Sequence, residues 1–106
     1  MELLQGTLDL LVLHALRDGG ELHGYAVQRR LEELSRGHLR VEEGSLYPAL
    51  YRLEHRAWIG SRWGRSENNR KARLYKLTAV GKRQLAAEER AWSEFSGAVD
   101  EVLGRK

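Results

Sequence analysis

The sequence contains no cysteine and a single proline among its 106 residues. Without cysteine, disulfides and every thiolate-based catalytic or metal site are excluded, which fits a protein of the reducing cytosol. No apolar run reaches the roughly 18 residues that a membrane span requires. The first charged residue is the acidic Glu2, unlike the basic start of a signal peptide. We therefore expect a cytoplasmic protein with no membrane partner.

The composition indicates one globular domain, with 42% hydrophobic and 31% charged residues. The net charge is only +3, but it is unevenly distributed. Residues 57–77 contain six basic residues and one acidic residue, Glu67, so this short segment carries +5 and the rest of the chain −2. Such a concentration of positive charge predicts a local anion-binding surface.

The stretch Glu42–Arg56 predicts a short helix with two unlike faces. The apolar residues on one face follow helical spacing; they are Leu46, Ala49, Leu50 and Leu53. Ser45 is the expected N-cap, which would place Pro48 in the first turn. The other face carries Tyr47, Tyr51, Arg52 and His55. These groups donate, accept and stack, which suits a groove of duplex DNA; the alternative is a solvated face with a few aromatic residues.

Two helices are expected before this stretch. The first, Thr7–Arg17, has Thr7 as N-cap and Gly19-Gly20 as its stop. It is apolar almost all round, so it is either the central core helix or partly covered by a second subunit. The second helix follows Leu22–Tyr25 and ends near Ser35, with an inner stripe of Tyr25, Val27, Leu31 and Leu34. A short strand is expected at His38–Val41.

A β-hairpin and a long helix are expected after it. Trp58–Trp63 and Lys71–Leu77 form the strands and Gly64–Arg70 the turn. The pattern leaves open which hairpin face is inward, although Tyr75 and Leu77 are the more apolar pair. The last helix has Thr78 as N-cap and runs to about Leu103. Its apolar residues recur at heptad spacing, which indicates a dimer seam that Glu88 interrupts; they are Leu85, Trp92, Phe95, Val99 and Val102.

Taken in order, these elements predict a mainly α fold with a small β-hairpin: a winged helix-turn-helix with a long C-terminal dimerisation helix. In that arrangement the third helix enters the major groove, and the hairpin, or wing, lies on phosphates or in the minor groove. The motifs are Leu4–Asp9, Leu22–Tyr25, Glu42–Leu50, Arg52–Glu54, Trp63-Gly64, Ser66–Arg70, Ala72-Arg73, Tyr75, Leu77-Thr78 and Gly81. With these motifs the chain resembles the PadR family of bacterial transcriptional regulators, in its subfamily with a single C-terminal helix.

The resemblance implies a homodimeric repressor that binds palindromic double-stranded DNA on the bacterial nucleoid, and some relatives are released by a small aromatic effector. Residues 1–78 would be the winged-helix domain and residues 79–106 the dimerisation helix, in one compact unit. The expected DNA-binding residues are Tyr25, Ser45, Tyr47, Pro48, Tyr51, Arg52, Asn68, Asn69, Arg70, Lys71 and Arg73. The residues expected at the dimer interface or effector site are Leu8, Leu11, Leu85, Trp92, Phe95 and Val99.

Alternatives remain at several of these positions. Tyr47 could be a half-buried tyrosine packed beside Pro48, and Arg52 could form a salt bridge with a nearby acid. Trp92 and Phe95 could simply pack across a dimer seam. The four histidines lack metal-ligand spacing, and Glu42-Glu43 has no base or nucleophile beside it, so neither a cofactor nor an enzyme is expected. A winged-helix module that docks an acidic protein partner is the competing function.

Overall fold

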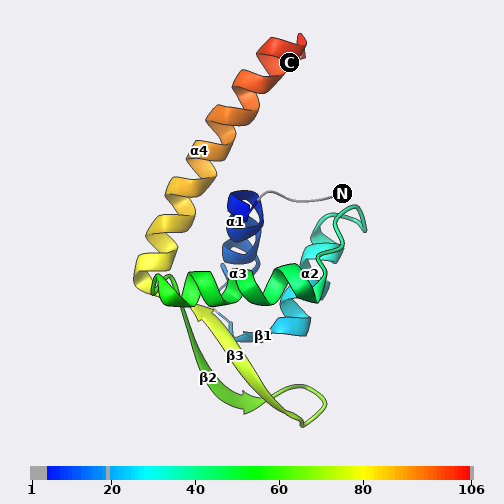
Figure 1. Ribbon diagram of the computed structural model, residues 1–106, viewed down its shortest axis with the longest axis vertical. Coiled ribbons are helices and arrows are strands. Elements are labelled where there is room, and N and C mark those ends of the chain that lie inside the picture. Colours follow the sequence, from blue (N-terminus) through cyan, green and yellow to red (C-terminus); the bar gives the residue numbers. More distant parts are fainter. Residues whose placement is uncertain (1–4, 19, 106) are drawn as a thin grey trace.

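The computed structural model describes residues 5–18 and 20–105 (Figure 1). Met1–Leu4, Gly19 and Lys106, which enter the expectations above, lie outside the described residues. The elements are α1 (Gln5–Ala15), β1 (Leu22–His23), α2 (Gly24–Leu34), α3 (Glu43–His55), β2 (Ile59–Arg65), β3 (Lys71–Leu77) and α4 (Ala79–Leu103). The hairpin extends from one end of the helical body, and α4 rises from the other side (Figure 1). This is the predicted winged helix-turn-helix with one added strand.

The added strand is β1, and it completes a three-stranded antiparallel sheet in the order β1–β3–β2. Leu22 pairs with Tyr75, and Ile59 at the start of β2 pairs with Leu77 at the end of β3. A two-residue strand is too short to show the alternation by which strands are recognised. The strand expected at His38–Val41 is wrong: this segment is a loop whose Val41 carbonyl accepts from the Gln28 side chain at 2.6 Å.

The core lies between the three N-terminal helices, the base of the hairpin and the start of α4. The four apolar residues predicted for the inner face of α3 are all buried, so that periodicity is confirmed; they are Leu46, Ala49, Leu50 and Leu53. Tyr75 and Leu77 form the inward face of β3. Most apolar residues of α1 are buried within this single chain, which favours the core-helix interpretation of α1. Among the described residues, no helix is both long and apolar enough to cross a membrane.

Two helix starts differ from the prediction. Helix α1 begins at Gln5, two residues before Thr7, and it ends at Ala15 instead of Arg17. Helix α3 begins at Glu43 instead of after Ser45, and Leu46 N–H donates to the Glu42 carbonyl at 2.9 Å. The prediction that Ser45 is the N-cap and that Pro48 lies in the first turn is therefore wrong. Pro48 is inside the helix, where its missing N–H leaves the Gly44 carbonyl without its usual partner.

The inner stripe predicted for α2 is half correct. Val27 and Leu31 are buried, whereas Tyr25 and Leu34 are each 57% exposed. The N-cap of this helix is His23, whose Nδ1 accepts a hydrogen bond from Ala26 N–H at 3.2 Å. The sequence does not predict this cap. Histidine is not among the residues that usually cap helices. Tyr25, the second residue of α2, thereby lies on the surface.

Helix α4 begins and ends where the sequence predicts. Thr78 Oγ1 accepts from Gly81 N–H at 2.9 Å, and Gly104 closes the helix in the left-handed conformation (φ +74°). Gly81 is required at its position, because an added Cβ would collide with the Trp58 carbonyl oxygen. Only the first turns of α4 are buried against the body, so most of this 25-residue helix projects outward.

Candidate nucleic-acid interface

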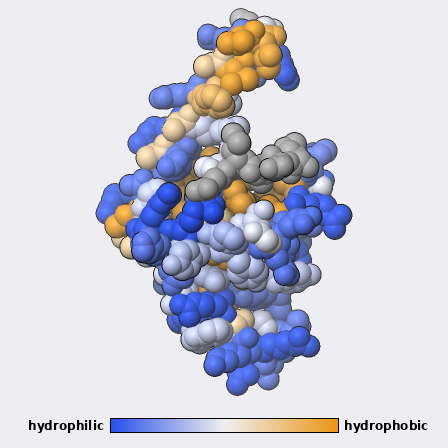
Figure 2. Space-filling model, in the orientation of Figure 1, coloured by the Kyte–Doolittle hydropathy of each residue, from blue (hydrophilic) through white to orange (hydrophobic). Residues whose placement is uncertain are grey.

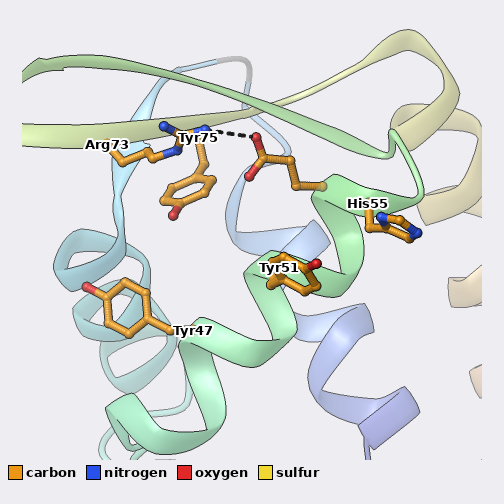
Figure 3. Close-up of a pocket in the computed structure, with 6 residues that line it drawn as sticks. Tyr47, Tyr51, His55, Arg73 and Tyr75 are labelled. Atoms are coloured by element: carbon orange, nitrogen blue, oxygen red, sulfur yellow. Dashed lines mark hydrogen bonds and ion pairs between the residues drawn. The ribbon is translucent and has the colours of Figure 1, made fainter.

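The outer face of α3 borders an open groove that β3 closes on the other side (Figure 3). The groove has a volume of about 640 Å³ and is lined by Tyr47, Tyr51, Glu54, His55, Arg73 and Tyr75. The three aromatic rings of α3 follow one another along the helix, and the Arg73 and Tyr75 side chains of β3 lie across the groove from Tyr47 (Figure 3). The hydroxyl and imidazole groups that the sequence places on one helix face thus share one concave surface.

Tyr47 is the most constrained of these rings. It is 45% exposed, and it lies so close to Gly24 that a Cβ at that position would meet its hydroxyl oxygen and ring carbons. The half-buried alternative is therefore partly correct, but the ring packs on the start of α2. Tyr51 is 72% exposed and lies parallel to the His55 ring, with centroids 6.2 Å apart. One tyrosine is held in place, and the other is available to a ligand.

The hairpin tip is the loop at 66–70, which connects β2 to β3. The Ser66 carbonyl accepts from Asn69 N–H at 2.9 Å, and Ser66 N–H donates to the Arg70 carbonyl at 2.8 Å. Asn69 takes the left-handed conformation (φ +58°), which asparagine tolerates better than most residues. This turn exposes Asn68, Asn69, Arg70 and Lys71 together.

An exposed tryptophan, Trp63, lies on the hairpin face that also carries Lys71 and Arg73. Trp63 pairs across the hairpin with Arg73, and it is 58% exposed. The Lys71 ammonium lies 5.0 Å from its ring centroid, and the Arg73 guanidinium 5.4 Å. From the sequence, Trp63 is expected only in a strand and in the Trp63-Gly64 motif, not in a binding surface. Pairing the strands around Glu67–Asn69 would have placed this ring beside the two cations.

Two arginines of the hairpin, Arg62 and Arg73, differ in how closely an acidic side chain pairs with them. Arg62 lies on the opposite face and is held by both carboxylate oxygens of Glu21 at 2.7 Å. This contact lowers the pKa of Glu21, and it raises the pKa of Arg62. Arg73 is 3.4 Å from Glu54 and still faces the groove. The charge of +5 therefore overstates the positive charge of the groove side.

Arg52 is directed into the protein. Its guanidinium donates to both carboxylate oxygens of Asp9, at 2.7 and 3.4 Å, and Asp9 is only 6% exposed. Arg56 lies 3.7 Å from the same carboxylate. The expectation that Arg52 contacts DNA is corrected: the salt-bridge alternative describes this side chain, which ties α3 to α1.

Tyr75 stands at the inner end of the groove. Burial raises the pKa of its phenol, and the nearby carboxylate of Glu54 raises it further, while Arg73 opposes the change. Its hydroxyl therefore stays protonated and can donate or accept a hydrogen bond at neutral pH.

The six residues expected at a dimer interface or effector site fall into two groups. Leu8 and Leu85 are buried in the core of one chain, so the expectation is corrected for both. Leu11 and Trp92 line an apolar groove of about 630 Å³ between α1 and α4, together with Thr7, Leu10, His14, Leu39, Glu89 and Ser93. His14 Nδ1 and Glu89 Oε2 are 3.1 Å apart at its edge. Phe95 packs beside Trp92, whereas Val99 lies beyond the groove.

The far part of α4 exposes several apolar side chains. Phe95 is 62% and Val102 is 85% exposed. Figure 2 shows apolar surface at the free end of this helix and hydrophilic surface over the hairpin. A helix that exposes such a stripe normally packs against another element.

No group of three or more metal-ligating side chains gathers among residues 5–18 and 20–105.

Comparisons with known proteins agree with one another. The model of the transcriptional regulator PadR-like family matches residues 12–87. The transcriptional regulator Rv3488 of Mycobacterium tuberculosis is 36% identical over 103 residues, which cover 97% of this chain and 89% of that protein. A PadR family transcriptional regulator from Eggerthella lenta is 31% identical with a TM-score of 0.75, covering 92% of this chain and 82% of that one. A PadR-like regulator from Bacillus cereus is 27% identical with a TM-score of 0.76, covering 95% of each chain.

Proposed function

The chain belongs to the PadR-like family of transcriptional regulators, and we propose that it is a homodimeric repressor that binds duplex DNA through α3 and the wing, the hairpin β2–β3. One observation carries the proposal: the tyrosine face of α3 and the wing face that carries Arg73 border the same open groove. Lys71 lies beside Arg73 on that face, over the Trp63 ring. A helix in the major groove and a cationic loop on the neighbouring phosphates require these two surfaces to face one ligand. The DNA-binding set is Tyr25, Ser45, Tyr47, Pro48, Tyr51, Asn68, Asn69, Arg70, Lys71 and Arg73.

The residues of this set have different tasks. Tyr47 and Tyr51 reach base edges or phosphates with their hydroxyl groups, and Ser45 and Pro48 lie on the exposed side of the first turns of α3. Arg70 and Lys71 supply positive charge at the wing tip. Phosphate contacts fix the position of the protein, and base contacts give sequence preference.

The hairpin provides a matched pair of arginines for the test. The duplex is the upstream DNA of the gene, and binding is measured by fluorescence anisotropy at several salt concentrations. Arg70→Ala should weaken binding and reduce the slope of log K against log salt by about 0.9, the loss of one phosphate contact. Arg62→Ala removes the same charge from the opposite face and should change the slope far less. Equal effects of the two variants would refute phosphate contact by the wing.

Tyr47 is tested by a change that keeps its packing. Tyr47→Phe retains the ring against Gly24 and removes only the hydroxyl. If this hydroxyl contacts a base, affinity should fall more for the upstream duplex than for a scrambled duplex of equal composition. Equal losses would remove Tyr47 from base recognition. If the wild-type protein binds neither duplex at low salt, the protein-docking alternative is favoured.

Dimerisation would cover the exposed stripe of α4. Phe95→Glu places a charge in this stripe and should shift the protein toward the monomer in sedimentation velocity. Arg90→Glu alters the charge of the same helix at an exposed position without removing an apolar side chain, and it should leave the dimer intact. A wild-type protein that is monomeric at micromolar concentration would contradict this part of the proposal.

The groove beside Trp92 is the proposed site for a small aromatic effector. Leu10 and Leu11 supply apolar contact, and the indole supplies a stacking surface. In a variant carrying Trp58→Phe and Trp63→Phe, Trp92 is the sole tryptophan. A flat anionic aromatic probe such as 2-naphthoate, which does not intercalate into DNA, should quench its fluorescence and release the duplex. Quenching that leaves DNA affinity unchanged would exclude a regulatory site here.

A further inference from the structure

The single acidic residue of the wing lies at its tip, within the surface that is proposed to approach phosphate. Glu67 Oε1 is 3.3 Å from the Arg29 Nη2 and 3.4 Å from the His23 Nε2. Arg29 lies in the middle of α2, and His23 is the N-cap of that helix. One carboxylate oxygen therefore connects the loop of the wing to a helix almost 40 residues away in sequence.

The α2 side of this contact is ordered by its own packing. His23 accepts a hydrogen bond at Nδ1 as the cap of α2, and its Nε2 lies 3.4 Å from Glu67 Oε1. The Tyr25 ring lies parallel to the His23 ring at 6.3 Å, and the Arg29 guanidinium lies 5.4 Å from the Tyr25 centroid. The two partners of Glu67 thus both lie against the Tyr25 ring.

The wing has a second attachment at its base. Glu54 of α3 accepts from Ser61 of β2 and lies 3.4 Å from Arg73 of β3. The base is thereby fixed to the recognition helix, but the loop at 66–70 lies several residues beyond these contacts. Glu67 supplies the attachment at the loop itself.

A carboxylate near phosphate weakens DNA binding by repulsion, so its place in the tip calls for another role. We propose that Glu67 is a positioning residue: with Arg29 and His23 it forms a latch that holds the wing tip in register with α3 before DNA binds. The latch is a feature of the free protein, and its role in recognition rests on the function proposed above.

The first test uses the free protein and needs no DNA. Hydrogen exchange is measured for the amides of Ser66, Asn69 and Arg70, which form the loop hydrogen bonds. Glu67→Ala should accelerate their exchange about two- to five-fold, the range expected for exposed ion pairs. Adding Arg29→Ala to Glu67→Ala should give no further acceleration, because the contact is already lost. Unchanged exchange in Glu67→Ala would overturn the latch.

Arg30 provides the control for Arg29. It lies on the same helix and pairs with Asp18 at 2.8 Å, away from the wing. Arg30→Ala removes the same charge and should leave exchange at the loop as in the wild type. If Arg30→Ala accelerates loop exchange as much as Arg29→Ala, a general charge effect replaces the latch.

The second test measures recognition as the ratio of affinities for the upstream duplex and a scrambled duplex. Glu67→Ala and Arg29→Ala should each lower this ratio at least about two-fold. A wing tip that is no longer held in one position relative to α3 still binds phosphate, but it no longer fixes α3 over the bases. An unchanged ratio beside faster exchange would overturn the role in recognition. A loss in Glu67→Ala alone would mean that Glu67 itself contacts a base, which also overturns the latch. If the wild-type protein binds no duplex, the proposed function fails while the exchange test still decides whether the latch exists.

Discussion

Removal of the Arg52 side chain tests how much the contact between Arg52 of α3 and Asp9 of α1 stabilises the fold. Arg52 is about a quarter exposed and donates twice to the buried Asp9 carboxylate. Breaking a fully buried ion pair costs about 3–5 kcal/mol, and breaking an exposed pair costs about 0.2–1 kcal/mol. Because Arg52 is partly exposed and Arg56 remains 3.7 Å from Asp9, we expect Arg52→Ala to lower the free energy of unfolding by about 2–3 kcal/mol.

The assay is urea unfolding at one fixed protein concentration, because dimerisation would couple stability to concentration. A loss of this size moves the midpoint by roughly 1–2 M urea. Arg30→Ala is the matched control, since its pair with Asp18 has an equally short contact but an exposed carboxylate. It should cost less than about 1 kcal/mol. Equal losses in the two variants would refute the importance of burying Asp9.

The same variant separates the structural role of Arg52 from DNA contact. If the guanidinium serves only Asp9, the slope of log K against log salt for folded Arg52→Ala should match that of the wild type. A slope reduced by about 0.9 would show that Arg52 neutralises a phosphate and would contradict a purely structural role.

Three further predictions concern single residues. The pKa of Tyr75 is raised in the folded state, so its contribution to stability is complete below about pH 10 and is lost as pH rises further. Chemical unfolding should therefore show a steeper loss above pH 10 in the wild type than in Tyr75→Phe; equal slopes would refute this. Ala57 is held at φ +63°, so Ala57→Gly should stabilise the protein by about 0.5–1 kcal/mol in urea unfolding, and a loss would refute the strain. Gly24→Ala should displace the Tyr47 ring and weaken binding to the upstream duplex in anisotropy titrations, whereas an unchanged affinity would show that the position of this ring is unimportant.

The competing alternatives were decided by partners distant in sequence. Arg52 could serve DNA or an acid, and the acid is Asp9, 43 residues away on α1. Leu8 and Leu85 show the same apolar character as Trp92 and Phe95, but only the first two are enclosed by the fold of one chain. Hydrophobicity predicts that a side chain will be covered, and only packing decides whether the same chain covers it.

What the sequence alone determined is local. The inner face of α3, the two hairpin strands, the Thr78 cap and the end of α4 follow from spacing and capping within a few residues. The tertiary structure alone decided the two-residue strand β1, the pairing of Arg52 with Asp9 and the link from Glu67 to α2. These features depend on sheet pairing and on ion pairs between distant segments, and no local pattern encodes such distances.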